Sequence, residues 1–278
     1  MLNTALWLLA LTLAGSGIPA DPLHLVAWAP GYPGNATQAQ PTMDEFARLL
    51  ASASGWEAHQ VTAEYQETED GGLARLGRGD SELALLPLAL FFKYEEQLGL
   101  QPIAQIVGPE GESAETWSLV APTGQIEGPA DLAGWTVLGI PAYSEAFVRG
   151  TLLGDWGTLP ADVNVEFTSR VLGGVRRASG GENVAVLLDG AQTAALSSLP
   201  NADALEVVAT SGKVLMGLLV TVGGRLPATA EETLLQGLLN IHEDAAFADV
   251  LSTVRVSRFD AVDEVALSAS REAFDKAR

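Results

Sequence analysis

A turn at Pro141–Ser144 carries the residues best suited to hold a ligand. Trp135–Ile140, before it, is a short apolar run typical of a strand, and an amphipathic helical pattern follows it. The first N–H groups of a helix lack partners within the helix, and the helix dipole favours negative charge there. Small and hydroxyl side chains, Ala142, Tyr143 and Ser144, surround the turn, so these N–H groups could hold a small anion. The alternative is that Ser144 only caps the helix.

Alternating strands and helices position this turn. Periodicity and Gly/Pro breaks predict strands at 23–29, 56–65, 82–86, 101–107, 117–121, 135–140, 163–167, 184–188, 206–210 and 215–222. They predict a loop at 30–40 and helices at 41–55, 68–76, 88–98, 169–178, 229–241, 244–251 and 262–277. Strand followed by helix in this order implies an α/β protein with doubly wound, mostly parallel sheets.

Two interruptions in the pattern predict two lobes. Pro122–Pro129 breaks the chain and is a candidate hinge, and the strands after residue 206 are candidates for a second crossing. Two crossings would leave a cleft whose walls can close. The expected division is a signal segment at 1–20, a first lobe formed by 21–118 and 209–278, and a second lobe at 119–208.

An internal similarity suggests that the two lobes are built alike. RLGRGDSELALLPLA (Arg75–Ala89) and RRASGGENVAVLLDGA (Arg176–Ala191) share a basic residue, a glycine break, an acidic residue and an apolar strand.

Composition excludes several classes of protein. The chain has 278 residues, a formal net charge of −20 and 47% hydrophobic residues, which indicates a globular protein that repels nucleic acid. It has no Cys, so disulfides and thiolate metal sites are excluded. His24, His59 and His242 show no metal-ligand spacing, and GxSxG and P-loop motifs are absent. We expect neither a metal nor a cofactor.

The first twenty residues predict export. Ala5–Leu13 is apolar but too short to span a bilayer comfortably, and small residues follow before Asp21. We expect a cleaved signal peptide and a periplasmic or otherwise extracytoplasmic protein. An uncleaved membrane anchor and a buried first helix are the alternatives.

Five segments follow one another along the chain: GRGDSELALLPLALFFKYEE, PIAQIVG, WSLVAPTGQIEGPADLAGWTVLGIPAYSEAF, VAVLLDGAQ and EVVATSGKVLMGLLVTVGGRLP. Together they resemble the phosphate, phosphite and phosphonate substrate-binding proteins of ABC importers. The resemblance implies the two-lobed periplasmic binding protein fold with two hinge crossings, and an anion bound at helix N-termini facing the cleft. The ligand-binding positions that it implies are Tyr32, Asn35, Thr37, Pro87, Leu88, Tyr143, Ser144, Glu145, Asp189 and Gln192.

The chain also departs from the family pattern. Glu145 stands where the family's turn has hydroxyl and glycine residues, and a carboxylate there would repel an anion unless it points outward. Lys213 stands near the second crossing, where the family has Ile-Pro.

The resulting expectation is a monomeric, non-enzymatic protein that captures a small oxyanion and delivers it to a membrane permease. The alternatives are a sensor or scaffold on the same fold that binds another small acid or a protein partner, and a biosynthetic enzyme.

Overall fold

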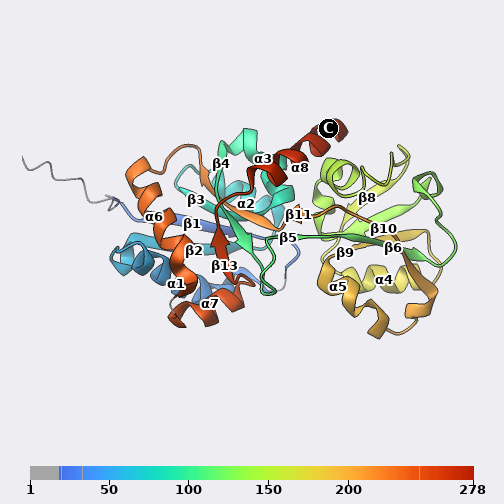
Figure 1. Cartoon of the computed structure of the whole chain (residues 1–278), viewed down its shortest axis with the longest axis horizontal. Coiled ribbons are helices and arrows are strands. Elements are labelled where there is room, and N and C mark those ends of the chain that lie inside the picture. Colours follow the sequence, from blue (N-terminus) through green and yellow to red (C-terminus); the bar gives the residue numbers. More distant parts are fainter. Residues whose placement is uncertain (1–18, 20, 33, 244) are drawn as a thin grey trace, which may run out of the picture.

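The computed structural model describes residues 19, 21–32, 34–243 and 245–278. Except for Pro19, the expected signal segment 1–20 lies outside the described residues. Two sheets, each flanked by helices, lie side by side along the long axis of the molecule (Figure 1). We call the unit around the six-stranded sheet the first lobe and the unit around the five-stranded sheet the second lobe.

The first lobe has strand order β13-β4-β12-β3-β1-β2. Its strands are β1 (Leu23–Trp28), β2 (Val61–Gln66), β3 (Leu83–Pro87), β4 (Leu100–Val107), β12 (Gly217–Val222) and β13 (Arg258–Asp260). Its helices are α1 (Ala36–Ala53), α2 (Glu69–Leu76), α3 (Leu88–Leu98), α6 (Ala228–Asn240), α7 (Ala248–Thr253) and α8 (Glu264–Ala277). β1 runs parallel to β2 and β3, whereas β12 is antiparallel to both β3 and β4.

The second lobe has strand order β10-β6-β9-β7-β8. Its strands are β6 (Ser118–Pro122), β7 (Thr136–Gly139), β8 (Asn164–Phe167), β9 (Val184–Leu188) and β10 (Leu205–Thr210), and its α-helices are α4 (Val171–Ser179) and α5 (Gly190–Ala195). A 3₁₀ turn, η3 (Ile140–Tyr143), and a π-helix, η4 (Phe147–Leu152), follow β7. β7 is parallel to β8 and β9, and β6 is antiparallel to β9 and β10. Mostly parallel strands in both lobes confirm the predicted fold class.

The two lobes share one topology. The order β4-β12-β3-β1-β2 in the first lobe corresponds to β10-β6-β9-β7-β8 in the second, with the antiparallel strand at the same place. The two similar sequence segments contain β3 and β9, which occupy equivalent positions. The internal similarity therefore reflects two lobes built alike.

Two short strands join the lobes. β5 (Ala114–Glu115) precedes β6, and β11 (Val214–Leu215) precedes β12; the two pair in an antiparallel manner between the larger sheets (Figure 1). The backbone N–H of Ser211 donates to the carbonyl oxygen of Trp117 at 2.8 Å, and the N–H of Trp117 donates to Ser211 Oγ at 2.9 Å. The crossings are thus tied to each other and can bend as one hinge.

Alternation along β1 divides the core of the first lobe. Leu25 and Ala27 pack on the side of α1, α6 and α7, whereas Val26 and Trp28 pack on the side of α2 and α3. The core on the second side is continuous with that of the second lobe. Apolar contact therefore holds the lobes together in this conformation.

The predicted loop at 30–40 is wrong beyond residue 35. Helix α1 begins at Ala36, because the Asn35 side chain accepts a hydrogen bond from the Gln38 N–H at 2.9 Å and caps it. Pro41 is the sixth residue of the helix, so the hydrogen bond that an N–H there would donate to the Thr37 carbonyl oxygen is missing. The sequence patterns also missed α5 and β13, both short.

The remaining short elements are 3₁₀ turns: η1 (Ala58–Gln60), η2 (Pro129–Leu132), η5 (Leu196–Ser198), η6 (Ala202–Ala204), η7 (Ile241–Glu243) and η8 (Ala245–Phe247). None of the helices in the described part of the chain combines the length and apolar character that crossing a membrane requires.

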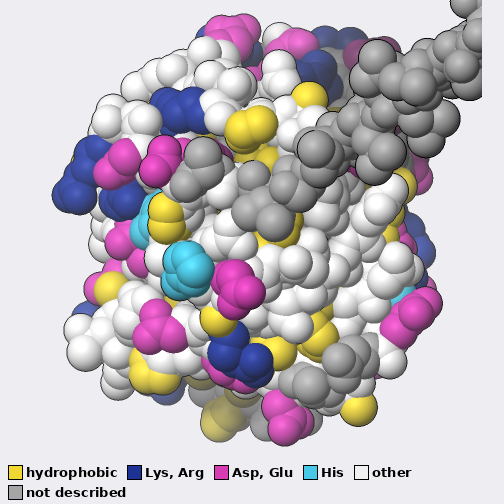
Figure 2. Space-filling model, turned by 90° about the vertical axis from the view of Figure 1, so that its left-hand side faces the viewer, with side chains coloured by type: hydrophobic (Ala, Val, Ile, Leu, Met, Phe, Trp, Pro, Cys, Tyr) yellow, Lys and Arg dark blue, Asp and Glu magenta, His cyan; other side chains and the backbone are white. Residues whose placement is uncertain are grey.

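The outer end of the first lobe has a mixed surface. Figure 2 shows acidic and basic side chains interspersed there, and hydrophobic side chains in small separate spots, over the part of this face that is not grey. Such a surface is typical of one exposed to water.

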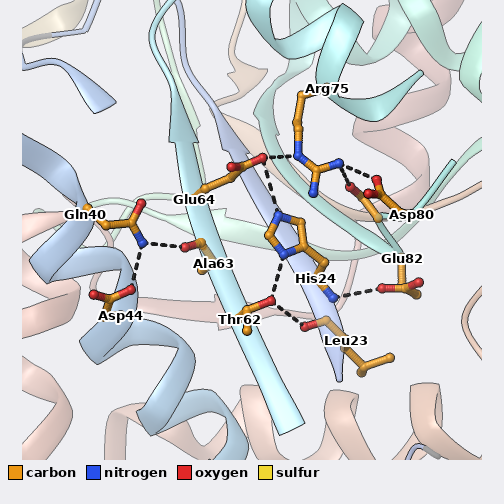
Figure 3. Close-up of polar contacts among 11 residues, drawn as sticks. Leu23, His24, Gln40, Asp44, Thr62, Ala63, Glu64, Arg75, Asp80 and Glu82 are labelled. Carbon is orange, nitrogen blue, oxygen red and sulfur yellow. Dashed lines mark hydrogen bonds and ion pairs between the residues drawn. The ribbon is translucent and has the colours of Figure 1, made fainter. Parts of the chain in front are cut away.

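A polar cluster joins β1, β2 and α2 in the first lobe (Figure 3). Arg75, 9% exposed, pairs with Glu64 and Asp80 and donates to Ser81 Oγ at 3.0 Å. His24 lies between Thr62, 2.7 Å from its Nδ1, and Glu64, 3.3 Å from its Nε2. The cluster fixes the register of α2 against the sheet by satisfying a nearly buried charge.

Candidate functional site

A small cavity lies between the lobes, next to the hinge. Its volume is about 20 Å³, which accommodates about one water molecule. Residues from both lobes and both crossings line it: Tyr32, Pro87, Leu88, Ala89, Glu115, Trp117, Ile140, Pro141, Tyr143, Phe147, Val214, Leu215 and Met216. The structure is therefore a closed conformation, and a ligand of several heavy atoms can enter only if the lobes separate.

Two tyrosines from equivalent loops face this cavity. Tyr32 follows β1 and Tyr143 follows β7, and each lines the cavity from its own lobe. Tyr143 is only 8% exposed, yet its hydroxyl has no hydrogen bond to any described residue. Burial raises the pKa of both tyrosines, and the charge of Glu115 raises the pKa of each one further. The Tyr143 hydroxyl is therefore free to form a hydrogen bond with a ligand in the cavity.

The start of α3 supplies backbone donors. Pro87 is the N-cap residue and makes no side-chain capping hydrogen bond, and Leu88 and Ala89 open the helix at the wall of the cavity. The first N–H groups of a helix have no partner within it and lie at the positive end of its dipole. This end of α3 can therefore donate to an oxyanion.

Glu115 places a carboxyl group in the same cavity. It lies in β5, and burial, together with the charge of Asp189, raises its pKa to about 7. The Trp117 side chain and Arg255 oppose this rise. Among the thirteen residues that line the cavity, Glu115 is the only one with a carboxyl group, and none is Lys or Arg.

Close backbone packing brings the lobes together beside the tyrosines. Gly31 has φ +87°, and a Cβ there would lie 3.1 Å from side-chain atoms of both Ile140 and Phe167 in the second lobe. Glycine both permits this backbone conformation and leaves room for the opposite lobe.

The C-terminal helix forms a third connection between the lobes. α8 packs between α3 and η4, and the Thr151 hydroxyl donates to the Ser270 carbonyl oxygen at 3.1 Å. The ring of Phe92 in α3 lies 5.3 Å from that of Phe274 in α8 and 6.2 Å from that of Phe147 in η4. Since Phe147 also lines the cavity, this aromatic contact couples the site to the C-terminus.

The predicted site residues fall into two groups. Tyr32, Pro87, Leu88 and Tyr143 are brought together at the cavity. The other six lie in capping or paired positions, or in the first turn of α1, and do not line it: Asn35, Thr37, Ser144, Glu145, Asp189 and Gln192.

Most residues of this second group form hydrogen bonds or ion pairs with residues close to them along the chain. Ser144 is buried, and its Oγ accepts from the Phe147 N–H at 3.4 Å. Glu145 pairs with Arg149 at 2.6 Å and is turned away from the cavity. Asp189 and Gln192 form a reciprocal capping box at the start of α5, although the charge of Asp189 still reaches Glu115 and Tyr32.

Sequence patterns missed Glu115, which was expected to lie in a polar loop. The only signal for it was an acidic residue just before the apolar run at the first crossing. Lys213, near the second crossing, pairs with exposed Glu112 at 3.3 Å and does not line the cavity.

Two lobes of one topology, joined by two paired strands and enclosing a cavity at the hinge, define a two-lobed periplasmic binding protein. The sequence matches, over residues 27–266, the family described as the periplasmic substrate-binding protein of phosphonate ABC transporters. The chain belongs to this family. It is therefore a solute-binding protein with an extracytoplasmic location, a small-molecule ligand and a membrane permease as partner. No curated protein sequence matches the chain.

Solved structures of low sequence identity share the fold. XAC2383 from Xanthomonas citri, bound to ATP, has 14% identity and a TM-score of 0.70, covering 93% of this chain and 98% of its own. A binding component of an ABC phosphonate transporter from Pseudomonas aeruginosa has 15% identity and a TM-score of 0.63, covering 92% and 89%. PhnD1 from Prochlorococcus marinus, in complex with methylphosphonate, has 14% identity and a TM-score of 0.59, covering 92% and 98%.

Proposed function

We propose that this protein captures a small oxyanion of the phosphonate or phosphate type between its two lobes. The observation that carries the proposal is the unpartnered hydroxyl of Tyr143, a residue that is 8% exposed and lines a cavity that the uncapped start of α3 also lines. Hydroxyl and backbone N–H groups are the donors that an oxyanion needs. The P. marinus protein, which shares the fold, was solved with methylphosphonate, and this supports the choice of ligand.

Capture requires the lobes to open and close. We propose that residues 21–118 and 209–278 move together as one unit and that residues 119–208 move as the other. The strands β5 and β11 form the hinge between them. A ligand that meets Tyr32 and α3 from one side and Tyr143 from the other makes all its contacts only in the closed form. Binding then shifts the population toward closure, and the permease reads the closed shape.

The remaining parts of the proposal concern the state of the protein in the cell. Residues 1–20 act as a signal peptide, and the mature protein is a monomer without catalytic activity. The exposed large hydrophobic side chains of the described residues stand singly on four elements, Phe167 on β8, Leu172 on α4, Val207 on β10 and Val265 on α8, which offers no large dimer surface. The net charge of −20 disfavours nucleic acid as a partner.

Thermal unfolding of the mature protein with a panel of ligands tests the function. The panel is phosphate, phosphite, methylphosphonate, a sulfonate and a dicarboxylate. A ligand at one hundred times its Kd stabilises by about 2.7 kcal/mol, which for a chain of this size raises Tm by roughly 5 to 10 °C. Stabilisation by a phosphorus oxyanion supports the proposal. A shift only with the dicarboxylate, or with no member of the panel, would falsify it.

A further inference from the structure

The charge lining the closed cavity conflicts with an anionic ligand. Glu115 is the one lining residue that can carry a full charge near neutral pH, and Asp189 adds a second negative charge close by. An oxyanion held by Tyr143 and the start of α3 would share this small space with the Glu115 carboxyl group. Two like charges in contact within a poorly solvated cavity repel strongly. A protonated carboxyl group instead donates a hydrogen bond to the anion.

We propose that the lobes close on an oxyanion only when Glu115 is protonated, so that Glu115 donates a hydrogen bond to the ligand and capture is coupled to proton uptake. This rests on the proposed function and adds its regulation. The proton comes from the solvent and binds one Oε of Glu115, and no covalent bond of the ligand changes.

Closure itself creates the need for the proton. Glu115 lies on the strand that leads out of the first lobe, whereas Asp189 begins α5 in the second lobe. Approach of the lobes therefore brings the two carboxylates together and withdraws Glu115 from water. Both effects raise the pKa of Glu115, to about 7 in the closed form. Near neutral pH, then, small changes in acidity change the charge of this site.

The other groups around Glu115 do not remove the conflict. Tyr32 and Tyr143 stay neutral, because burial raises their pKa values. Arg255 is exposed and only opposes the rise in the pKa of Glu115. In α3, Lys93 is engaged with Glu69 at 2.5 Å and with the Tyr143 carbonyl oxygen at 2.5 Å. No described cation therefore compensates Glu115 inside the cavity.

Isothermal titration calorimetry of the mature protein provides the test, with methylphosphonate and inorganic phosphate as probes. If only protonated Glu115 permits capture, the apparent Kd weakens above the pKa that Glu115 has in the ligand-free protein. From pH 6 to pH 8 this weakening is roughly tenfold if that pKa is about 7, as in the closed form, and larger if the lobes rest open and the pKa is lower. Titrations at pH 8 in two buffers of different ionisation enthalpy should show uptake of about one proton per ligand. The uptake at pH 6 should not exceed the uptake at pH 8.

Three substitutions separate Glu115 from other sources of pH dependence. Glu115→Gln supplies a permanent donor, so its Kd should change with pH only as far as the probe itself titrates, and the uptake due to Glu115 should disappear. Asp189→Asn keeps an N-capping side chain and removes the neighbouring charge, so the midpoint should move to lower pH. Glu112→Gln, at an exposed position on the same crossing but outside the cavity, should titrate like the wild type.

The wild-type proton count keeps the test decisive even if a variant fails to fold. Wild-type binding that shows no proton uptake at pH 8 beyond that of the probe overturns the proposal, and so does a Glu115→Gln titration identical to wild type. The proposal also fails if 2-aminoethylphosphonate binds far more tightly than methylphosphonate at pH 8 without proton uptake, because Glu115 would then meet the ligand as a carboxylate. Absence of binding by both probes at every pH overturns the proposed function, and the inference with it.

Discussion

Tyr32 and Tyr143 each lie four residues beyond the end of equivalent strands, β1 ending at Trp28 and β7 at Gly139, and their side chains line one cavity. The shared topology of the lobes explains this relationship, because loops at the carboxyl ends of parallel strands meet where two such sheets face each other. The cleft thus takes one hydroxyl from each half of the molecule.

Replacing Tyr143 by Phe should weaken ligand binding without destabilising the protein. The hydroxyl has no partner among the described residues, so its loss costs the folded chain little. Affinity for the bound oxyanion should fall roughly three- to tenfold, the net value of one hydrogen bond. Calorimetric titration and thermal melting measure the two effects separately. Tyr65→Phe is the control: its hydroxyl donates to the Ala29 carbonyl oxygen at 3.0 Å, so stability should fall instead. Unchanged affinity in Tyr143→Phe would contradict the assignment.

Replacing Gly150 by Ala should loosen the contact between the C-terminal helix and the second lobe. A Cβ at Gly150 would overlap the carbonyl oxygen of Ala273 in α8, so either the helix or the lobe must move. We expect a lower melting temperature and a larger radius of gyration in small-angle scattering of the ligand-free protein. Gly173→Ala, in α4, meets only Arg170 Cβ at 3.8 Å and should be neutral or stabilising by up to about 1 kcal/mol. Identical scattering of wild type and Gly150→Ala would argue against α8 as a connection between the lobes.

Replacing Arg75 by Met should destabilise the first lobe by about 2 kcal/mol, because Glu64 and Ser81 lose a charged donor in a nearly buried place. The double substitution Arg75→Met with Glu64→Gln should recover part of this loss, since the less exposed of the two carboxylates that Arg75 pairs with is then neutral, and Asp80 is exposed to water (Figure 3). Urea denaturation measures both. Arg48→Met, which breaks the exposed pair with Glu45, should leave stability unchanged. Equal effects at Arg75 and Arg48 would show that the cluster is not structural.

Glu115 should make stability fall as the pH rises toward neutrality. Burial and Asp189 raise its pKa to about 7 in the folded protein, from about 4.3 in the unfolded chain. Between these values the folded state binds more protons, so the free energy of unfolding decreases with pH and levels off above about pH 7. Glu115→Gln should therefore exceed the ligand-free wild type at pH 8, by on the order of 1 to 3 kcal/mol, and match it near pH 4. Denaturation at the two pH values measures this, and a constant difference would contradict the buried position of Glu115.

Local patterns predicted most of the regular structure. The helix at Leu88–Leu98 and the strand at Val184–Leu188 have the predicted bounds, because a Pro before the helix and an Asp-Gly pair after the strand mark their ends. The start of α1 was missed, since Pro41 resembles a first helical residue and the capping role of Asn35 is less evident. The segment after Ser144 became a π-helix, whose register depends on its packing against α8 rather than on its own sequence.

The site was predictable only in part. Four residues selected from the resemblance line the cavity, because they sit on loops whose place follows from the fold. Glu115 could not be found in this way: its burial arises from the pairing of β5 with β11, almost one hundred residues apart along the chain, and from the approach of Asp189 in the other lobe. Contacts between residues so far apart along the chain produce no periodic pattern in the sequence.

The seam between α8 and η4 offers a way to time the motion of the molecule. The chain contains no cysteine, so one introduced at Ala277, which faces Gly150 across the seam, would be a unique thiol. Its rate of alkylation would report how often α8 and the second lobe separate. A solute that slows this alkylation could then be detected as a ligand without being labelled itself.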